Sequence, residues 1–367
     1  MNQQKPNLPG ISVVIIGLNV RRYLHQCIRA VQASNYPREL LEIIYVDSGS
    51  SDTSQEIARS YRDVRVLCLN TDKPNAAKGR NAGLNASRFE LIQFVDADSY
   101  LHPDWLLEAT ENMQGKTAAV AGGLFERYPN KNIYHRMAGV EWNLRRNDRG
   151  WTISEKKALV FGGNVMIKRS AIKKAGGYDE LLRAGEDPDL SYRIRQLGFE
   201  ILRLNQVMAS HDINIGSRQQ FLKRSRRSGY AYAMLALKYW KEPERFMVRQ
   251  FFRIVVGALA PTLVLITGAL TGYPYIAAIL SLLIAFRLIF KTNSFARILN
   301  ESRVFSLRYN LYLASVVYPQ FLGVIDALIE EFLPRRTNRW TPSKPDPIVA
   351  GVSHSSSLNN SHIKIGA

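Results

Sequence analysis

Leu91-Ile92-Gln93-Phe94-Val95 leads directly into Asp96-Ala97-Asp98, and this stretch decides both the fold class and the first candidate site. A short apolar run predicts a buried strand, so the two carboxylates stand at its carboxyl end. Such a pair suits a hard divalent cation, Mg²⁺ or Mn²⁺, which keeps coordination positions open for phosphate oxygens. The alternative is a solvated pair at a strand end, because short Asp-x-Asp strings are common.

Three similar runs precede this stretch, and helical patterns separate them. They are Ile11–Ile16, Ile43–Val46 and Val64–Leu67. Alternating strands and helices predict an α/β fold with a mostly parallel sheet between helices. Ligands bind such sheets at the carboxyl ends of the strands. Asp47 follows the second run as Asp96 follows the fourth, so we expect both carboxylates to face one crevice.

Two further segments carry candidate groups. Lys78–Gly83 combines cations with flexible backbone, and the planar fork of Arg80 suits a diphosphate. From this segment alone, a solvated basic turn is the simpler interpretation. Glu186-Asp187-Pro188 precedes a helical pattern, which makes Asp187 either the N-cap of a helix or a general base.

Taken in order, these segments resemble the family 2 inverting glycosyltransferases, which have the GT-A fold of nucleotide-diphospho-sugar transferases. Each motif alone is weak, whereas an ordered set is specific. The resemblance covers residues 11 to 230. The matching segments are Ser12–Asn19, Val46–Asp52, Gly79–Gly83, Phe94–Asp98, Phe161–Asn164, Gly176–Glu180 and Gly185–Leu190.

On the donor side, the resemblance implies a role for each motif residue. Asp47 would contact the nucleoside of a nucleotide-sugar donor, and Arg80 would approach its pyrophosphate. Asp96 would help to hold the ribose or the donor sugar, and Asp98 would ligate the metal. Asp96 and His211 are further candidate ligands, and a structural histidine is the alternative for His211.

On the acceptor side, the resemblance makes Asp187 the catalytic base. A single inverting displacement needs one base to take the proton of the acceptor hydroxyl, and no carboxylate nucleophile. Glu186 beside it would be a supporting or acceptor-binding group. Gly163 and Asn164 would belong to the acceptor-side strand.

Two departures from the family pattern are visible. Many relatives carry a second acidic residue where this chain has Ser48, which leaves base recognition there open. Processive members carry Gln-x-x-Arg-Trp after the Glu-Asp motif. Here Arg224–Gly229 matches that motif only at Arg227, which weakens the case for a processive polymerase.

The last third of the chain predicts a membrane association. A dense basic flank precedes the uncharged run Ile254–Phe286, and two candidate spans, 254–271 and 274–290, fall on and just beyond this run. A third stretch, 311–333, is interrupted by acidic residues and either spans the membrane or lies along its surface. A buried hairpin of a soluble domain is the less favoured alternative. Because positive flanks stay inside, we expect a cytoplasmic catalytic domain at a cell inner membrane or plasma membrane.

The expected organisation is an N-terminal extension over 1–10, a catalytic domain over 11–240, a membrane-associated helical region over 241–334 and a polar, disordered tail over 335–367. A net charge of +18 suits anionic partners. Since the basic residues flank an apolar hairpin, the membrane surface explains them better than nucleic acid. Two cysteines and an N-terminus without an apolar signal core favour the cytosol.

The leading hypothesis is an inverting, divalent-metal-dependent glycosyltransferase. It would move a sugar from a nucleotide-diphosphate sugar, with UDP-sugar favoured, to a hydroxyl of a lipid-linked or glycan acceptor at the membrane, in surface polysaccharide or glycolipid synthesis. One rival is a polyprenyl-phosphate glycosyltransferase, whose ionised acceptor scarcely needs a base. The other is a non-catalytic nucleotide-sugar-binding subunit of a membrane complex.

Overall fold

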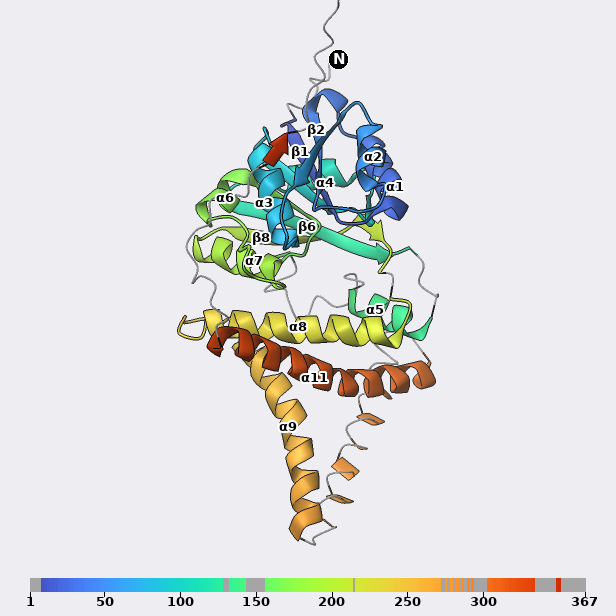
Figure 1. Ribbon diagram of the computed structural model, residues 1–367, viewed down its shortest axis with the longest axis vertical. Helices are drawn as coiled ribbons and strands as arrows, with labels where there is room; N and C mark the ends of the chain where they lie inside the picture. Colours follow the sequence, from blue (N-terminus) through green and yellow to red (C-terminus); the bar gives the residue numbers. More distant parts are fainter. Residues whose placement is uncertain are drawn as a thin grey trace, which may run out of the picture.

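A sheet domain lies over two long helices in the computed structural model, and a third helix runs away from them (Figure 1). The structure describes residues 8–127, 132–142, 156–213, 215–271, 302–333 and 348–350, together with isolated positions between 275 and 293.

The first half of the sheet is parallel, as the sequence predicts. Its strands follow the order β3-β2-β1-β4, and nearly all of their apolar side chains are buried. Helices cover both faces: α1, α2 and α4 pack on one face, and α3, α6 and α7 on the other. The elements of this half are β1 (Ile11–Gly17), α1 (Arg21–Gln32), the 3₁₀ turn η1 (Arg38–Leu40), β2 (Leu41–Asp47), α2 (Ser54–Arg59), β3 (Val64–Leu69), α3 (Ala76–Ala86) and β4 (Leu91–Asp96).

The amphipathic pattern of α1 shows why these helices dock on the sheet. Its buried side chains are Leu24, Cys27, Ile28 and Val31, which recur at the three- and four-residue spacing of one helix face. That face meets the sheet residues of β1 and β2 in one apolar cluster.

The second half makes the sheet mixed. β7 runs antiparallel to both β4 and β6, while β6 and β8 are parallel to each other with irregular register. The α/β class is therefore confirmed, with the parallel strands concentrated before Asp98. The elements are β5 (Ser99–Leu101), α4 (Trp105–Glu111), β6 (Thr117–Glu126), α5 (Ile133–Trp142), β7 (Val165–Lys168), α6 (Arg169–Lys174), α7 (Glu186–Gln196) and β8 (Glu200–His211).

Two helices, α8 (Arg218–Lys238) and α11 (Arg303–Phe332), lie side by side beneath the sheet domain (Figure 1). Their backbones touch where neither helix has a side chain. A Cβ on Gly229 would lie 1.9 Å from the carbonyl oxygen of Gln320, and a Cβ on Gly323 would lie 1.9 Å from that of Arg226. Arg226 also pairs with both carboxylate oxygens of Asp326 at 2.6 Å. The two helices thus form one platform, which we call the α8–α11 platform.

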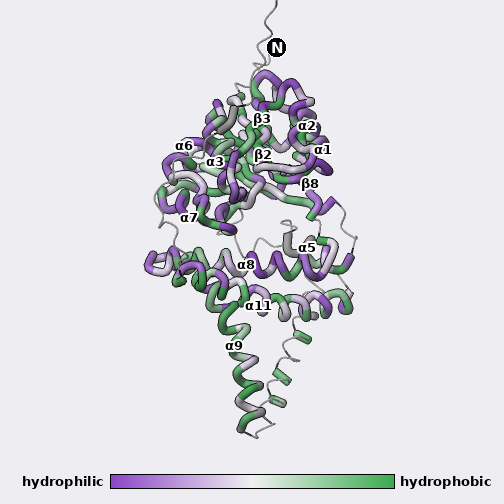
Figure 2. The backbone as a smooth tube through the Cα atoms, viewed as in Figure 1, coloured by the Kyte–Doolittle hydropathy of each residue, from purple (hydrophilic) through white to green (hydrophobic). Residues whose placement is uncertain are grey.

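The third long helix, α9 (Val248–Thr271), projects from this platform and is hydrophobic along most of its length (Figure 2). By length and composition, Val248–Gly268 and Arg303–Phe332 each suffice to cross a membrane. The predicted span 254–271 falls within α9. The predicted span 274–290 lies outside the described residues except at isolated positions.

The predicted stretch 311–333 falls almost entirely within α11. Most of the predicted tail, 335–367, lies outside the described residues. Within it, β9 (Ile348–Ala350) pairs antiparallel with the edge strand β3, which differs from the disorder expected there.

Candidate active site

The carboxyl ends of three neighbouring strands form the floor of the site. β1 lies between β2 and β4, with Gly17 opposite Asp47 and Ile16 opposite Asp96. The predicted placement of the two acids on one edge of the sheet is therefore confirmed. The same edge continues into Asp98 and β5.

Asp47 organises the turn that follows β2. Its carboxylate is fully buried and accepts hydrogen bonds from the backbone N–H groups of Gly49 at 3.0 Å and Ser50 at 2.8 Å. The side chains of Gln55 at 2.9 Å and Tyr45 at 3.0 Å donate to it as well. Because these four donors take up most of its acceptor capacity, Asp47 shapes the backbone of this turn.

Arg80 lies at the centre of the site, where α3 carries it into the interior. Its Nη2 is 3.0 Å from Asp96 Oδ1, and its Nη1 is 3.0 Å from Glu186 Oε1 and 3.2 Å from Asp187 Oδ1. The guanidinium also lies 5.5 Å from the centre of the Tyr178 ring. Burial alone would lower the pKa of Arg80, but the carboxylates hold that pKa well above its usual value, so the group is a permanent cation.

Gly163 and Asn164 line the same pair of charges from the segment before β7. A Cβ on Gly163 would lie 2.3 Å from Asp96 Oδ2 and 2.4 Å from Arg80 Nη2, so only glycine leaves room for this ion pair. Asn164 Oδ1 accepts a hydrogen bond from the Asp96 backbone N–H at 3.1 Å, and its Nδ2 donates to Ser99 Oγ at 3.1 Å. The structure thus brings both residues against the metal motif predicted at Asp96 and Asp98.

The β5–β8 ladder places Ser99, the residue after Asp98, opposite His211. Burial raises the pKa of Asp98, and the nearby charge of Asp96 raises it further. Burial also lowers the pKa of the His211 imidazole, whose Nδ1 has no hydrogen-bond partner among the described residues. Crowded carboxylates beside a neutral imidazole are a donor set that fits a divalent cation.

Asp187 is held at the start of α7, and the N-cap interpretation is wrong. The helix begins one residue earlier, at Glu186, and Gly185 occupies the N-cap position with a left-handed φ of 94° that favours glycine. Asp187 Oδ1 is buried and accepts no hydrogen bond from the described residues. Burial raises the pKa of this carboxyl, Glu186 and Asp96 raise it further, and Arg80 and Arg227 oppose the rise.

Two arginines of α8, to which the sequence analysis assigns no role in the site, act on its carboxylates. The charge of Arg224 lowers the pKa values of Asp98 and His211, and that of Arg227 lowers the pKa of Asp187. Both belong to the basic flank of the apolar run, and Arg227 is also the one residue that matches the family's Gln-x-x-Arg-Trp motif. The available signal was the three-residue spacing of Arg224 and Arg227, because this spacing puts both side chains on one face of α8.

Comparisons with known proteins agree with this geometry. The Glycosyl transferase family 2 model matches residues 12–176. The chain is 25% identical over 209 residues to Glycosyltransferase AglE of Haloferax volcanii, an alignment that covers 56% of this chain and 67% of AglE. It is 30% identical over 208 residues to the Probable glycosyltransferase YdaM of Bacillus subtilis, which covers 53% of this chain and 48% of YdaM.

The fold has a solved counterpart. Mannosyltransferase PcManGT from Pyrobaculum calidifontis, solved in complex with GDP-Man and Mn²⁺, superposes with a TM-score of 0.63 over 89% of each chain at 16% identity. At 16% identity, this structural similarity shows the fold alone, which is the GT-A fold. Together, the match of the family 2 model to residues 12–176, the glycosyltransferase relatives and this shared fold show a glycosyltransferase family 2 domain, which includes the sheet edge that carries Asp47 and Asp96.

Proposed function

We propose that this protein transfers a sugar from a nucleotide-diphosphate sugar to a hydroxyl of a membrane-associated acceptor, with inversion and with the help of a divalent cation. The observation that carries the proposal is the buried, raised-pKa carboxylate of Asp187. It lies 3.2 Å from Arg80, which also contacts the metal motif through Asp96. The guanidinium of Arg80 thus contacts both the proposed base, Asp187, and the proposed donor site at Asp96.

Asp98 would hold the cation, Mg²⁺ or Mn²⁺, with Asp96 and His211 as further ligands. When bound, the cation neutralises the charge of the departing nucleoside diphosphate. The Mn²⁺ and GDP-Man of the solved mannosyltransferase support a metal and a nucleotide sugar. A UDP-sugar remains the favoured donor, and the turn built by Asp47 would receive its nucleoside.

Asp187 would accept the proton of the attacking hydroxyl. A carboxylate with a raised pKa is a stronger base than an exposed one, and it needs only hydrogen-bond reach to the acceptor. Arg80 would keep Asp187 in place, and its charge favours the ionised form. Since both Nη atoms of Arg80 already contact carboxylates, it would also act on the pyrophosphate by its charge.

The acceptor would approach between the sheet domain and the α8–α11 platform. Arg224 and Arg227 lie on α8, the platform helix nearer to the sheet domain (Figure 1), and two cations there suit an acceptor that carries phosphate. This supports a lipid-linked saccharide at the inner face of a cell inner membrane or plasma membrane, with the catalytic domain in the cytoplasm.

The platform itself would lie on the membrane surface. The α11 helix packs along α8, while its opposite face exposes an apolar stripe at helical spacing. The helix α9 would enter the bilayer beside it, since it is apolar and mostly exposed. The exposed apolar side chains of α11 are Val304, Leu307, Leu311, Tyr318, Leu322, Ile325, Ile329 and Phe332.

The first test is calorimetric binding of UDP, with GDP for comparison, to the detergent-solubilised protein with and without Mn²⁺. We expect UDP binding that requires Mn²⁺ and is lost in Asp98→Ala. A preference for GDP would keep the site and change the donor class to mannose-type donors. If Mn²⁺ changed the binding of neither UDP nor GDP, the assignment of Asp96 and Asp98 to a metal site would be contradicted.

A second candidate is a polyprenyl-phosphate glycosyltransferase, and the placement of Arg224 and Arg227 favours it. An ionised phosphate acceptor would need those cations more than it needs a base. Product on polyprenyl phosphate alone, together with an active Asp187→Asn variant, would support this candidate. Donor binding without turnover over a broad panel of acceptors would instead support a non-catalytic subunit.

A further inference from the structure

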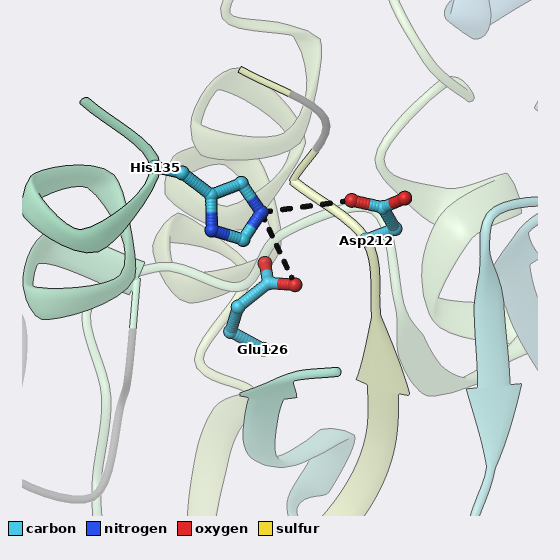
Figure 3. A group of neighbouring side chains, drawn as sticks. All are labelled: Glu126, His135 and Asp212. Atoms are coloured by element: carbon cyan, nitrogen blue, oxygen red, sulfur yellow. Dashed lines mark ion pairs between the residues drawn. The ribbon is translucent and has the colours of Figure 1, made fainter. Parts of the chain in front are cut away.

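A second cluster of metal-ligating side chains lies beside the site, at the junction of three elements (Figure 3). Glu126 ends β6, Asp212 follows β8, and His135 comes from α5. His135 Nε2 is 3.3 Å from Glu126 Oε1 and 3.6 Å from Asp212 Oδ1. One ligand atom from each residue lies within 4.8 Å of the other two.

The three side chains are more deeply buried than those of an ordinary surface salt bridge. The side chains of His135 and Asp212 are 0% exposed, and that of Glu126 is 6% exposed. Two buried carboxylates need positive charge close by, because an uncompensated charge in the interior is strongly destabilising. Neither ring nitrogen of His135 has a hydrogen-bond partner among the described residues. His135 Nε2 therefore faces both carboxylates without a hydrogen bond to either.

We propose that Glu126, His135 and Asp212 bind a structural divalent transition-metal ion, distinct from the catalytic cation. An ion about 2.1 Å from each donor separates neighbouring donors by roughly 3.0–3.4 Å. The separation of 3.3 Å falls within that range, and the separation of 3.6 Å lies 0.2 Å above it. An imidazole with two carboxylates suits Zn²⁺ or Mn²⁺, since Mg²⁺ prefers oxygen ligands alone.

The ion would fasten the sheet to the α8–α11 platform. The helix α5, which carries His135, contributes Met137 to an apolar cluster with Phe221 of α8 and Tyr309 of α11. Glu126 and Asp212 stand at the ends of two sheet strands, and Glu126 Oε2 also accepts a hydrogen bond from the Ile213 backbone N–H at 2.9 Å. Metal binding would thus fix the platform relative to the strand end that presents His211.

The competing arrangement is a protonated His135 that bridges the two carboxylates without metal. The full-length, detergent-solubilised protein separates the two cases. The Asp98→Ala variant is used as the background, so that the catalytic cation does not contribute. After dialysis against a weak chelator, its metal content is measured by mass spectrometry. Its melting temperature is measured with EDTA, and again after Zn²⁺ or Mn²⁺ is added back.

We expect about one equivalent of transition metal to remain per chain, and EDTA to lower the melting temperature reversibly. His135→Gln in the same background should lose that equivalent. His102→Gln is the matched control, because His102 is an exposed histidine 3.8 Å from Asp104, and it should retain the metal.

If the protein contained no metal and EDTA left its melting temperature unchanged, the proposal would be overturned in favour of the ion-pair arrangement. Equal metal content in His135→Gln and its parent would overturn it as well. Should His135→Gln fail to fold, Asp212→Asn replaces it, and the chelation of the parent protein still decides between the two arrangements.

Discussion

Arg80 Nη1 lies 3.2 Å from Asp187 Oδ1, and this contact joins two elements that are more than a hundred residues apart in the sequence. The same guanidinium holds Asp96 at the end of β4. The proposed base and the proposed donor site therefore share one buried counter-ion, so a change at either carboxylate alters the charge felt by the other.

Asp187→Asn should abolish transfer and keep donor binding. Asparagine has the size of aspartate, but its amide cannot accept the proton of the acceptor hydroxyl. The value of kcat should therefore fall by about 10²–10⁴-fold. Steady-state kinetics with calorimetric UDP binding checks this. Asp189→Asn is the matched control on the same helix. Asp189 is buried among Arg193, Lys238 and Tyr239, so that variant should lose stability rather than kcat. An unchanged kcat in Asp187→Asn would remove the base assignment.

The pH dependence of kcat/KM should show the titration of the Asp187 carboxyl group. Burial raises the pKa of Asp187 to about 8, and the ionised form is the base. The value of kcat/KM should therefore rise tenfold per pH unit below about 8 and level off above it. Arg227→Gln should move the midpoint to higher pH, since the charge of Arg227 lowers this pKa. A flat profile from pH 6 to 9 would contradict the assignment.

Gly163→Ala should weaken metal-dependent nucleotide binding. The new Cβ would meet Asp96 Oδ2 at 2.3 Å and Arg80 Nη2 at 2.4 Å, so the ion pair has to move. Overpacking of this kind costs about 1–3 kcal/mol, which corresponds to roughly tenfold or more in affinity. Gly162→Ala is the adjacent control, because nothing lies within 4 Å of its added Cβ. Equal affinities for the two variants in calorimetry would show that this close approach is not needed.

The orientation of α11 can be tested with single cysteines at its two ends. If the helix lies on the inner membrane surface, Ser302→Cys and Leu333→Cys should both react with a membrane-impermeant maleimide from the cytoplasmic side, in a background where Cys68 is replaced by Ser. A spanning helix would leave only one of them reactive from that side. Inside-out and right-side-out vesicles provide the two measurements.

The first four strands and their helices follow from local pattern alone. Runs such as Ile11–Ile16 are apolar at every position except Ser12, because parallel strands are buried on both faces, and this pattern does not depend on what packs against them. The position of Asp47 and Asp96 at strand ends follows in the same way. The mixed second half carries no comparable signal, because β7 is only four residues long and β6 and β8 are irregular in register.

The α/β class, the sheet edge that carries the acids and the apolar last third can therefore be predicted from local pattern. The packed fold was needed to show that Arg80 is shared by three carboxylates, that Gly185 rather than Asp187 caps α7, and that Arg224 faces Asp98. It also brought Glu126, His135 and Asp212 together. The reason is physical: strand and helix patterns reflect the burial of neighbouring residues, whereas each of these groupings joins distant segments whose approach is set by packing and charge.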